Sequence, residues 1–201
     1  MNTPVYIITG FLESGKTKFI SEMLADEGFS EGERTLLLCC EEGEEEYDSK
    51  LLHRTNTVLE PLDEPEDLEK LVELDEKYRP ERVIIEYNST WLLQALYSAK
   101  KPESWDLAQI ITLVDSTTFE IYLKNMRSFM ADGLTEADLV IFNRCTEETT
   151  KSPYRRTVLA MNNTARIFFE NTDGSMDDGV SDEDLPYDVS AKIIEISDTQ
   201  F

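Results

Sequence analysis

The sequence is poor in positive charge and in the residues that most often bind metals or form disulfides. It has 19 Lys and Arg residues against 42 Asp and Glu residues, which gives a formal net charge of −23 at pH 7. Such a surface repels nucleic acid and anionic lipid, so neither is expected as a partner. The single histidine is His53, and the cysteines are Cys39, Cys40 and Cys145. An odd number of cysteines, two of them adjacent, argues against a disulfide framework and predicts a reducing compartment, the cytoplasm.

Long hydrophobic runs are also missing. No apolar stretch approaches the roughly 20 residues that a helix needs to cross a bilayer. The N-terminus has no basic region, and its apolar run is short and enters a glycine loop, so we interpret it as a first strand and not as a signal peptide. With 201 residues and 40% hydrophobic content, the chain can form the core of one domain.

Residues 10–17, Gly-Phe-Leu-Glu-Ser-Gly-Lys-Thr, fit the G-x-x-x-x-G-K-[ST] pattern of a phosphate-binding loop. Glycines at its two ends let backbone N–H groups point into a concave turn around a polyphosphate. Lys16 is predicted to reach the β- and γ-phosphates, and the Thr17 hydroxyl to bind Mg²⁺. The predicted nucleotide-binding residues of the loop are Gly10, Glu13, Ser14, Gly15, Lys16 and Thr17.

Apolar runs alternate with helical stretches, which predicts an α/β fold with a doubly wound, mostly parallel sheet, the plan of a P-loop NTPase. The expected strands are residues 5–9, 35–40, 82–86, 110–115, 139–143 and 166–169, and the expected helices are 18–25, 61–78, 91–99, 119–130 and 154–161. The predicted domains are a nucleotide-binding domain over 1–170, an acidic linker over 171–188, and at 189–201 an extra edge strand or the start of a further domain.

Acidic residues follow several of these strands, at the edge where such sheets bind ligands. Glu86 is predicted to be the Walker-B-like acid that holds Mg²⁺ through water, and Asp115 to support the metal from further out. Glu41 and Asp48 are candidates to orient the attacking water. Together with Glu44, Glu41 also offers oxygen ligands for a second divalent metal. For each acid, the alternative is a residue that caps a helix or faces solvent.

Residues 9–17 closely resemble the T-G-F-L-x-[SA]-G-K-T segment of the CobW-like P-loop GTPases, relatives of the nickel-insertion GTPases of hydrogenase and urease. A generic phosphate-binding loop does not need Phe11 and Leu12, so these two residues favour this family over other families with such a loop. Residues 40–44 are also similar to the family's N-E-F-G-E segment, and residues 161–165 to its [LV]-N-P-x-A segment. Glu86 stands where the family has E-x-x-G, Asp115 where it has V-V-D, and Asn143 at the first position of N-K-x-D.

The resemblance covers residues 4–170 and implies Mg²⁺-dependent GTP binding and hydrolysis. It adds Asn143 to the nucleotide-binding residues, and it implies a metallochaperone or a regulator of cofactor assembly. The expected partners are a nucleotide and a metalloprotein client, with a homodimer as a further possibility.

Three departures from the family pattern leave the nucleotide and the metal open. The C-x-C-C metal motif is absent after residue 48, so the family's usual thiolate site is not expected. Thr146 stands where N-K-x-D has the Asp that accepts two hydrogen bonds from guanine, and a hydroxyl cannot make that contact. Ser89 replaces the glycine of E-x-x-G. The alternatives to a GTPase are an ATP-dependent P-loop enzyme and a nucleotide-binding switch with little hydrolysis.

Overall fold

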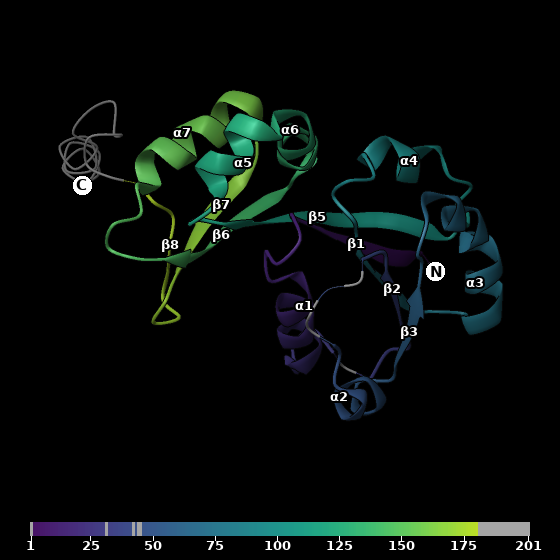
Figure 1. Ribbon diagram of the computed structural model, residues 1–201. Helices are drawn as coiled ribbons and strands as arrows, with labels where there is room; N and C mark the ends of the chain where they lie inside the picture. Colours follow the sequence, from purple (N-terminus) through teal and green to yellow (C-terminus); the bar gives the residue numbers. More distant parts are fainter. Residues whose placement is uncertain (1, 31, 42, 44–45, 181–201) are drawn as a thin grey trace, which may run out of the picture.

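One sheet organises the chain, and helices cover both of its faces (Figure 1). The structure, a computed structural model, describes residues 2–30, 32–41, 43 and 46–180. Within these residues the sheet has eight strands in the order β3-β2-β4-β1-β5-β6-β7-β8. Neighbouring strands are parallel except for β7 and β8, which are antiparallel. The doubly wound α/β fold predicted from the sequence is confirmed.

The bounds of β1, β2, β4 and β6 follow the sequence pattern closely, whereas β5 begins at Trp105, before the expected residue 110. The strands are β1 (Thr3–Thr9), β2 (Thr35–Cys39), β3 (Thr57–Pro61), β4 (Arg82–Glu86), β5 (Trp105–Asp115), β6 (Leu139–Cys145), β7 (Arg166–Asn171) and β8 (Met176–Asp177). The helices are α1 (Lys16–Ala25), α2 (Ser49–Arg54), the 3₁₀ helix η1 (Pro65–Lys70), α3 (Leu71–Tyr78), α4 (Leu93–Ser98), α5 (Phe119–Asn125), α6 (Arg127–Glu136) and α7 (Lys151–Met161).

The central strands are buried on both faces, which explains their continuous apolar runs. Along β2, Leu37 packs with α1 and α2, whereas Leu36 and Leu38 pack with α3 and α4. Helices α5, α6 and α7 cover the other half of the face that carries α3 and α4, over β5, β6 and β7. The strands therefore run between two helix layers, and their carboxyl ends meet at one edge of the sheet.

Strands β3 and β8 and helix α2 are not among the elements expected from the sequence. Strand β3 and helix α2 lie in the interval between the second expected strand and the helix expected at 61–78. Strand β3 is an edge strand in which only Thr57 is buried and the other side chains are partly or fully exposed, so it has no continuous apolar run. Its last residue is Pro61, which an edge strand tolerates because no further ladder hydrogen bond is lost. The helix expected at 119–130 is divided at Met126 into α5 and α6.

The segment predicted as an acidic linker begins as part of the sheet instead. Residues 176–177 form β8, which pairs with Phe169 and Glu170 of β7. Lys151 Nζ holds this hairpin by donating to Asn171 Oδ1 at 2.7 Å and to Asp177 Oδ2 at 2.6 Å. The rest of the predicted linker from residue 181, and the strand or domain start predicted at 189–201, lie outside the described residues. Among the helices that are described, none is long and apolar enough to span a membrane.

Candidate functional site

The loop between β1 and α1 has the backbone that its glycines predict. Gly10 has φ +142°, and Gly15, at the N-terminus of α1, has φ +87°. A Cβ atom at Gly10 would lie 2.4 Å from the Leu113 carbonyl oxygen and 2.5 Å from Ser14 Oγ, so only glycine fits there. The loop thus turns sharply between the sheet edge and the positive end of the α1 dipole, the place where helices bind anions.

Lys16 is buried under this loop, with all three of its N–H groups used. Its Nζ donates to the carbonyl oxygen of Gly10 at 2.6 Å and to that of Phe11 at 3.0 Å. It also forms an ion pair of 2.5 Å with Glu41 Oε2. Glu41 comes from the segment after β2, so this acid reaches the phosphate loop, as its predicted role requires.

The Glu86 carboxylate, only 3% exposed, gathers donors from three parts of the chain. It lies at the end of β4, between β1 and β2, opposite Cys39. Thr17 Oγ1 donates to its Oε1 at 2.8 Å, and Tyr47 OH donates to its Oε2 at 2.5 Å. The Cys39 thiol lies 3.5 Å from Oε2. Glu86 is therefore brought to the predicted Mg²⁺ ligand Thr17.

Burial and the neighbouring Glu86 charge keep two of these donors protonated. Both effects raise the pKa of the Tyr47 hydroxyl, and they raise the pKa of the Cys39 thiol to about 12. Sequence reasoning did not single out Tyr47. The sequence feature that could have indicated Tyr47 is that it is an aromatic residue in an otherwise acidic segment beside a predicted ligand site.

A cavity of about 240 Å³ opens in front of these groups. Its walls bring together the loop, α1, the end of β4 and the segment after β2. Among its lining residues are Gly15, Lys16, Thr17, Glu41, Glu86 and Arg144. Lys16 provides a cation, the helix N-terminus provides amides, and Thr17 and Glu86 provide oxygen ligands, so this cavity is suited to a polyphosphate with a divalent cation.

The predicted acid Asp48 does not line this cavity. Asp48 is exposed and accepts the N–H of Lys50 at 2.9 Å, which caps α2. The capping alternative considered for the acids therefore describes Asp48. Glu44 lies outside the described residues.

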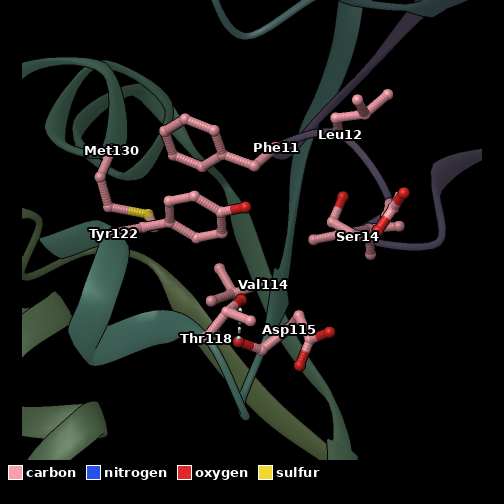
Figure 2. Close-up of a pocket in the computed structure, with 10 residues that line it drawn as sticks. Phe11, Leu12, Ser14, Val114, Asp115, Thr118, Tyr122 and Met130 are labelled. Carbon is pink, nitrogen blue, oxygen red and sulfur yellow. Dashed lines mark hydrogen bonds between the residues drawn. The ribbon is translucent and has the colours of Figure 1, made fainter. Parts of the chain in front are cut away.

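Asp115 ends β5 and is paired with Arg144 instead of standing near Thr17. Burial raises its pKa, but hydrogen bonds from Thr117 and from Arg144 outweigh that effect and hold the pKa below its usual value. Figure 2 shows Asp115 in a second, smaller cavity with Phe11 and Tyr122. The Phe11 ring stacks on Tyr122 with centroids 4.5 Å apart, which fixes the start of the phosphate loop against α5.

Side chains from two other strand ends hold the loop directly. Asn143 Nδ2 donates to the Ser14 carbonyl oxygen at 2.7 Å, so the end of β6 touches the loop where the resemblance predicts a nucleotide contact. The backbone N–H of Gly10 donates to Ser89 Oγ at 2.9 Å. The serine that replaces a family glycine thus fixes the first residue of the loop.

A neighbouring cavity of about 320 Å³ extends the site along α1. It shares Gly15 and Arg144 with the phosphate-side cavity. Asn143 and Glu170 line it from the ends of β6 and β7. The two cavities together form one site along the carboxyl edge of the sheet.

A dedicated transition-metal centre is not visible in the part of the chain that the structure describes. No group of three or more His, Cys, Asp or Glu side chains there could hold a metal ion. His53 is exposed on α2, and Cys40 and Cys145 are buried in apolar clusters. The oxygen atoms of Thr17 and Glu86 are the described pair placed to hold a hard cation.

The sequence matches the family described as "CobW/HypB/UreG, nucleotide-binding domain" over residues 4–169. The chain belongs to this family. As a CobW/HypB/UreG domain it is a nucleotide-binding domain of the P-loop NTPase class, in agreement with the loop geometry above. No curated protein matches the sequence.

Solved structures share the fold of this CobW/HypB/UreG domain. The Zn(II)-bound YjiA GTPase from E. coli is similar with a TM-score of 0.59 and 20% identity, over 83% of this chain and 57% of that chain. Hydrogenase maturation factor HypB from Archaeoglobus fulgidus gives 0.57 and 14%, over 85% and 82%. HypB from Helicobacter pylori in complex with nickel gives 0.55 and 14%, over 96% and 86%. The chain thus spans 57% of the length of YjiA.

Proposed function

We propose that this CobW/HypB/UreG domain binds and hydrolyses GTP with Mg²⁺ in metal handling or cofactor assembly. The observation that carries the proposal is the meeting of Lys16, Thr17 and Glu86 at one cavity beside the phosphate loop. The family assignment supports GTP as the nucleotide, and solved relatives that hold Zn(II) or nickel support the link to metals. The client is a metalloprotein.

The phosphates are held by the backbone amides of residues 13–16 and by the N-terminus of α1. Lys16 can donate to a phosphate oxygen only by giving up one of its three present acceptors, since an ammonium group has three N–H groups. Glu41 is the acceptor to be displaced, because it is the only anion among the three and repels the incoming phosphate. GTP binding therefore moves Glu41, which transmits the event to the segment after β2.

The residues present fit Mg²⁺. Thr17 and Glu86 offer a hydroxyl and a carboxylate that already lie 2.8 Å apart, and oxygen is the ligand that Mg²⁺ prefers. When bound, Mg²⁺ would neutralise charge on the β- and γ-phosphates. Tyr47 and Cys39 remain as neutral donors on the other oxygen of Glu86 and keep its carboxylate oriented.

Hydrolysis needs a group that orients water, and Glu41 is the acid in reach. Once released from Lys16 it stays beside the phosphate cavity as a free carboxylate. Phosphoryl transfer depends mainly on positioning and on electrostatic stabilisation, so one placed acceptor is a sufficient role for this chain.

The test is calorimetric titration of the whole chain with GTP, GDP and ATP, each with and without Mg²⁺, followed by phosphate release. Micromolar binding of guanine nucleotides and Mg²⁺-dependent release of phosphate from GTP are the expected results. Tighter binding and turnover of ATP would instead support the ATP-dependent alternative. Guanine-nucleotide binding without phosphate release would support the alternative of a nucleotide-binding switch with little hydrolysis.

A further inference from the structure

The residue that should read guanine in this family is missing, and the structure shows that Thr146 does not take its place. Thr146 is used inside its own turn: its N–H donates to Thr149 Oγ1 at 2.9 Å, and its Oγ1 accepts the N–H of Glu148 at 3.3 Å. It does not line the cavity beside Asn143. The two adjacent donors on the Watson–Crick edge of guanine, N1–H and the N2 amine, need a pair of acceptors from elsewhere.

An irregularity in the sheet brings a different acid to that cavity. Phe142 pairs with Phe169 and Cys145 with Asn171, and the register between β6 and β7 shifts in between. Two residues of β6, Asn143 and Arg144, therefore lie opposite the single residue Glu170. Arg144 has φ +54°, a left-handed backbone conformation at this irregularity. Bulges re-aim side chains, and this one puts Asn143, Arg144 and Glu170 around one cavity.

The Glu170 carboxylate is half-buried there and is not engaged by any described side chain. The cation opposite it, Arg144, donates to Asp115 instead. The other acid at this cavity, Glu22, is exposed and is paired with Lys18 on α1. Glu170 is thus an acceptor pair held by a strand, beside an amide that is itself fixed to the phosphate loop.

The position of the cavity matches that of a nucleobase. It shares Gly15 and Arg144 with the phosphate-side cavity, so one nucleotide can occupy both. Asn143 Nδ2 gives one N–H to the Ser14 carbonyl oxygen, and the amide has a second N–H for N7 or O6 of a purine. Phe19 offers an aromatic side chain on the α1 side.

We propose that Glu170 determines the guanine specificity of this chain, by accepting N1–H and N2–H from the base while Asn143 donates to N7 or O6. This inference rests on the proposed function and specifies its base. Adenine has an acceptor at N1 and no amine at C2, so the carboxylate would face a lone pair. A well-formed bidentate contact of this kind corresponds to a roughly 10- to 100-fold preference.

The experiment measures dissociation constants of the whole chain for GDP, ADP and xanthosine diphosphate, in wild type, Glu170→Gln and the control Glu148→Gln. Xanthine keeps N1–H but has a carbonyl at C2, which an amide complements and a carboxylate does not. We expect Glu170→Gln to weaken GDP binding about 10- to 100-fold and to tighten binding of xanthosine diphosphate. Glu148→Gln, in the Thr146 turn, changes neither by more than about twofold.

GDP affinity in Glu170→Gln within twofold of wild type would overturn the inference, as would equal binding of GDP and ADP by wild type. In both cases the phosphate-binding function would stand. Wild type that binds none of the three nucleotides would overturn the proposed function itself. If circular dichroism shows that Glu170→Gln does not fold, Glu170→Asp serves instead: a shortened carboxylate should weaken GDP about tenfold, and unchanged affinity contradicts the assignment.

Discussion

The site has a phosphate half, the cavity lined by Lys16, Thr17 and Glu86, and a base half, the cavity lined by Asn143 and Glu170. The two halves differ in how completely the chain satisfies its own polar groups. In the phosphate half, Lys16 uses all three N–H groups on acceptors of the protein, and both oxygens of Glu86 accept hydrogen bonds. In the base half, Glu170 has no side-chain partner among the described residues, and the buried Oδ1 of Asn143 has none either. A ligand must therefore displace protein contacts in the first half, whereas it adds contacts in the second.

Tight binding and base selection are therefore separable in this site. The phosphate half sets whether a nucleotide binds and what must move when it does. The base half sets which nucleotide binds, with little rearrangement. Variants in the two halves should accordingly give different signatures.

Lys16→Ala should have the largest effect, because it removes the buried cation that contacts the phosphate loop directly. We expect GTP affinity to fall about 1,000-fold, measured by titration calorimetry, while the thermal melt stays close to that of wild type. The base half cannot compensate, since its contacts are to the base alone. Unchanged GTP affinity would contradict the phosphate-loop assignment.

Gly10→Ala should disrupt the same half through the backbone. The new Cβ would meet the Leu113 carbonyl oxygen and Ser14 Oγ at a φ that L-residues rarely adopt, so we expect a loss of about 3 kcal/mol in the free energy of unfolding. Gly32→Ala is the matched control, because Gly32 also has positive φ but has nothing within 4 Å of the added atom. It should cost only about 1 kcal/mol in urea denaturation. Equal losses would show that the contact is not tight.

Glu41→Gln should act in the opposite direction on affinity. Neutralising the anion that competes for Lys16 is expected to tighten GTP binding about tenfold and to slow turnover, since the amide is a weaker acceptor for water. Asp48→Asn makes the same charge change at an exposed cap in the same segment and should leave both quantities near wild type. Weaker binding in Glu41→Gln would show that Glu41 supports the phosphate half instead of competing within it.

The smallest expected effect is the contribution of Cys39 to the loss of stability at alkaline pH. Burial and the Glu86 charge raise its pKa to about 12 from 9.0, so the unfolded chain releases this proton at a lower pH than the folded chain does. The stabilisation is complete below pH 9 and is lost as pH rises from 9 toward 12. Urea denaturation at pH 8 and 10 should show wild type losing at most about 1 kcal/mol more than Cys39→Ser, since solvent screens a half-exposed thiol. Identical losses would show that the pKa of the thiol is not raised in the folded chain.

The phosphate half could be predicted from the sequence because its residues are contiguous or end central strands. Residues 10–17 carry their own conformational requirements, and Glu86 ends a continuous apolar strand whose place beside β1 follows from the fold. Tyr47 could not be predicted in the same way, because its contact with Glu86 depends on the path of a loop. Asp115 also ends an apolar strand, but Arg144 engages it, and Asp48 caps α2 through a local hydrogen bond.

The place of Glu170 in the base half could not be predicted from the sequence, because it depends on strand register. Nothing in the sequence around Asn143 signals that two residues of β6 face one residue of β7. Without that shift, Glu170 is an acid that follows the strand predicted at 166–169. Thr146 is then the residue to consider for base recognition, because it stands where the family has its guanine-binding Asp. A mostly parallel sheet could be expected from the alternating pattern, but a one-residue irregularity in its ladder could not.

Because Glu41 forms an ion pair with Lys16, its carboxylate competes with any incoming anion for that lysine. A tethered carboxylate has a high effective concentration, in the millimolar range for short flexible connections. A lone phosphate or sulfate ion, with one contact to gain, should therefore displace it poorly at cellular concentrations. A nucleoside triphosphate gains many contacts at once and can outcompete it. The acid thus acts as a threshold that filters small anions from the site and reserves the lysine for polyphosphates.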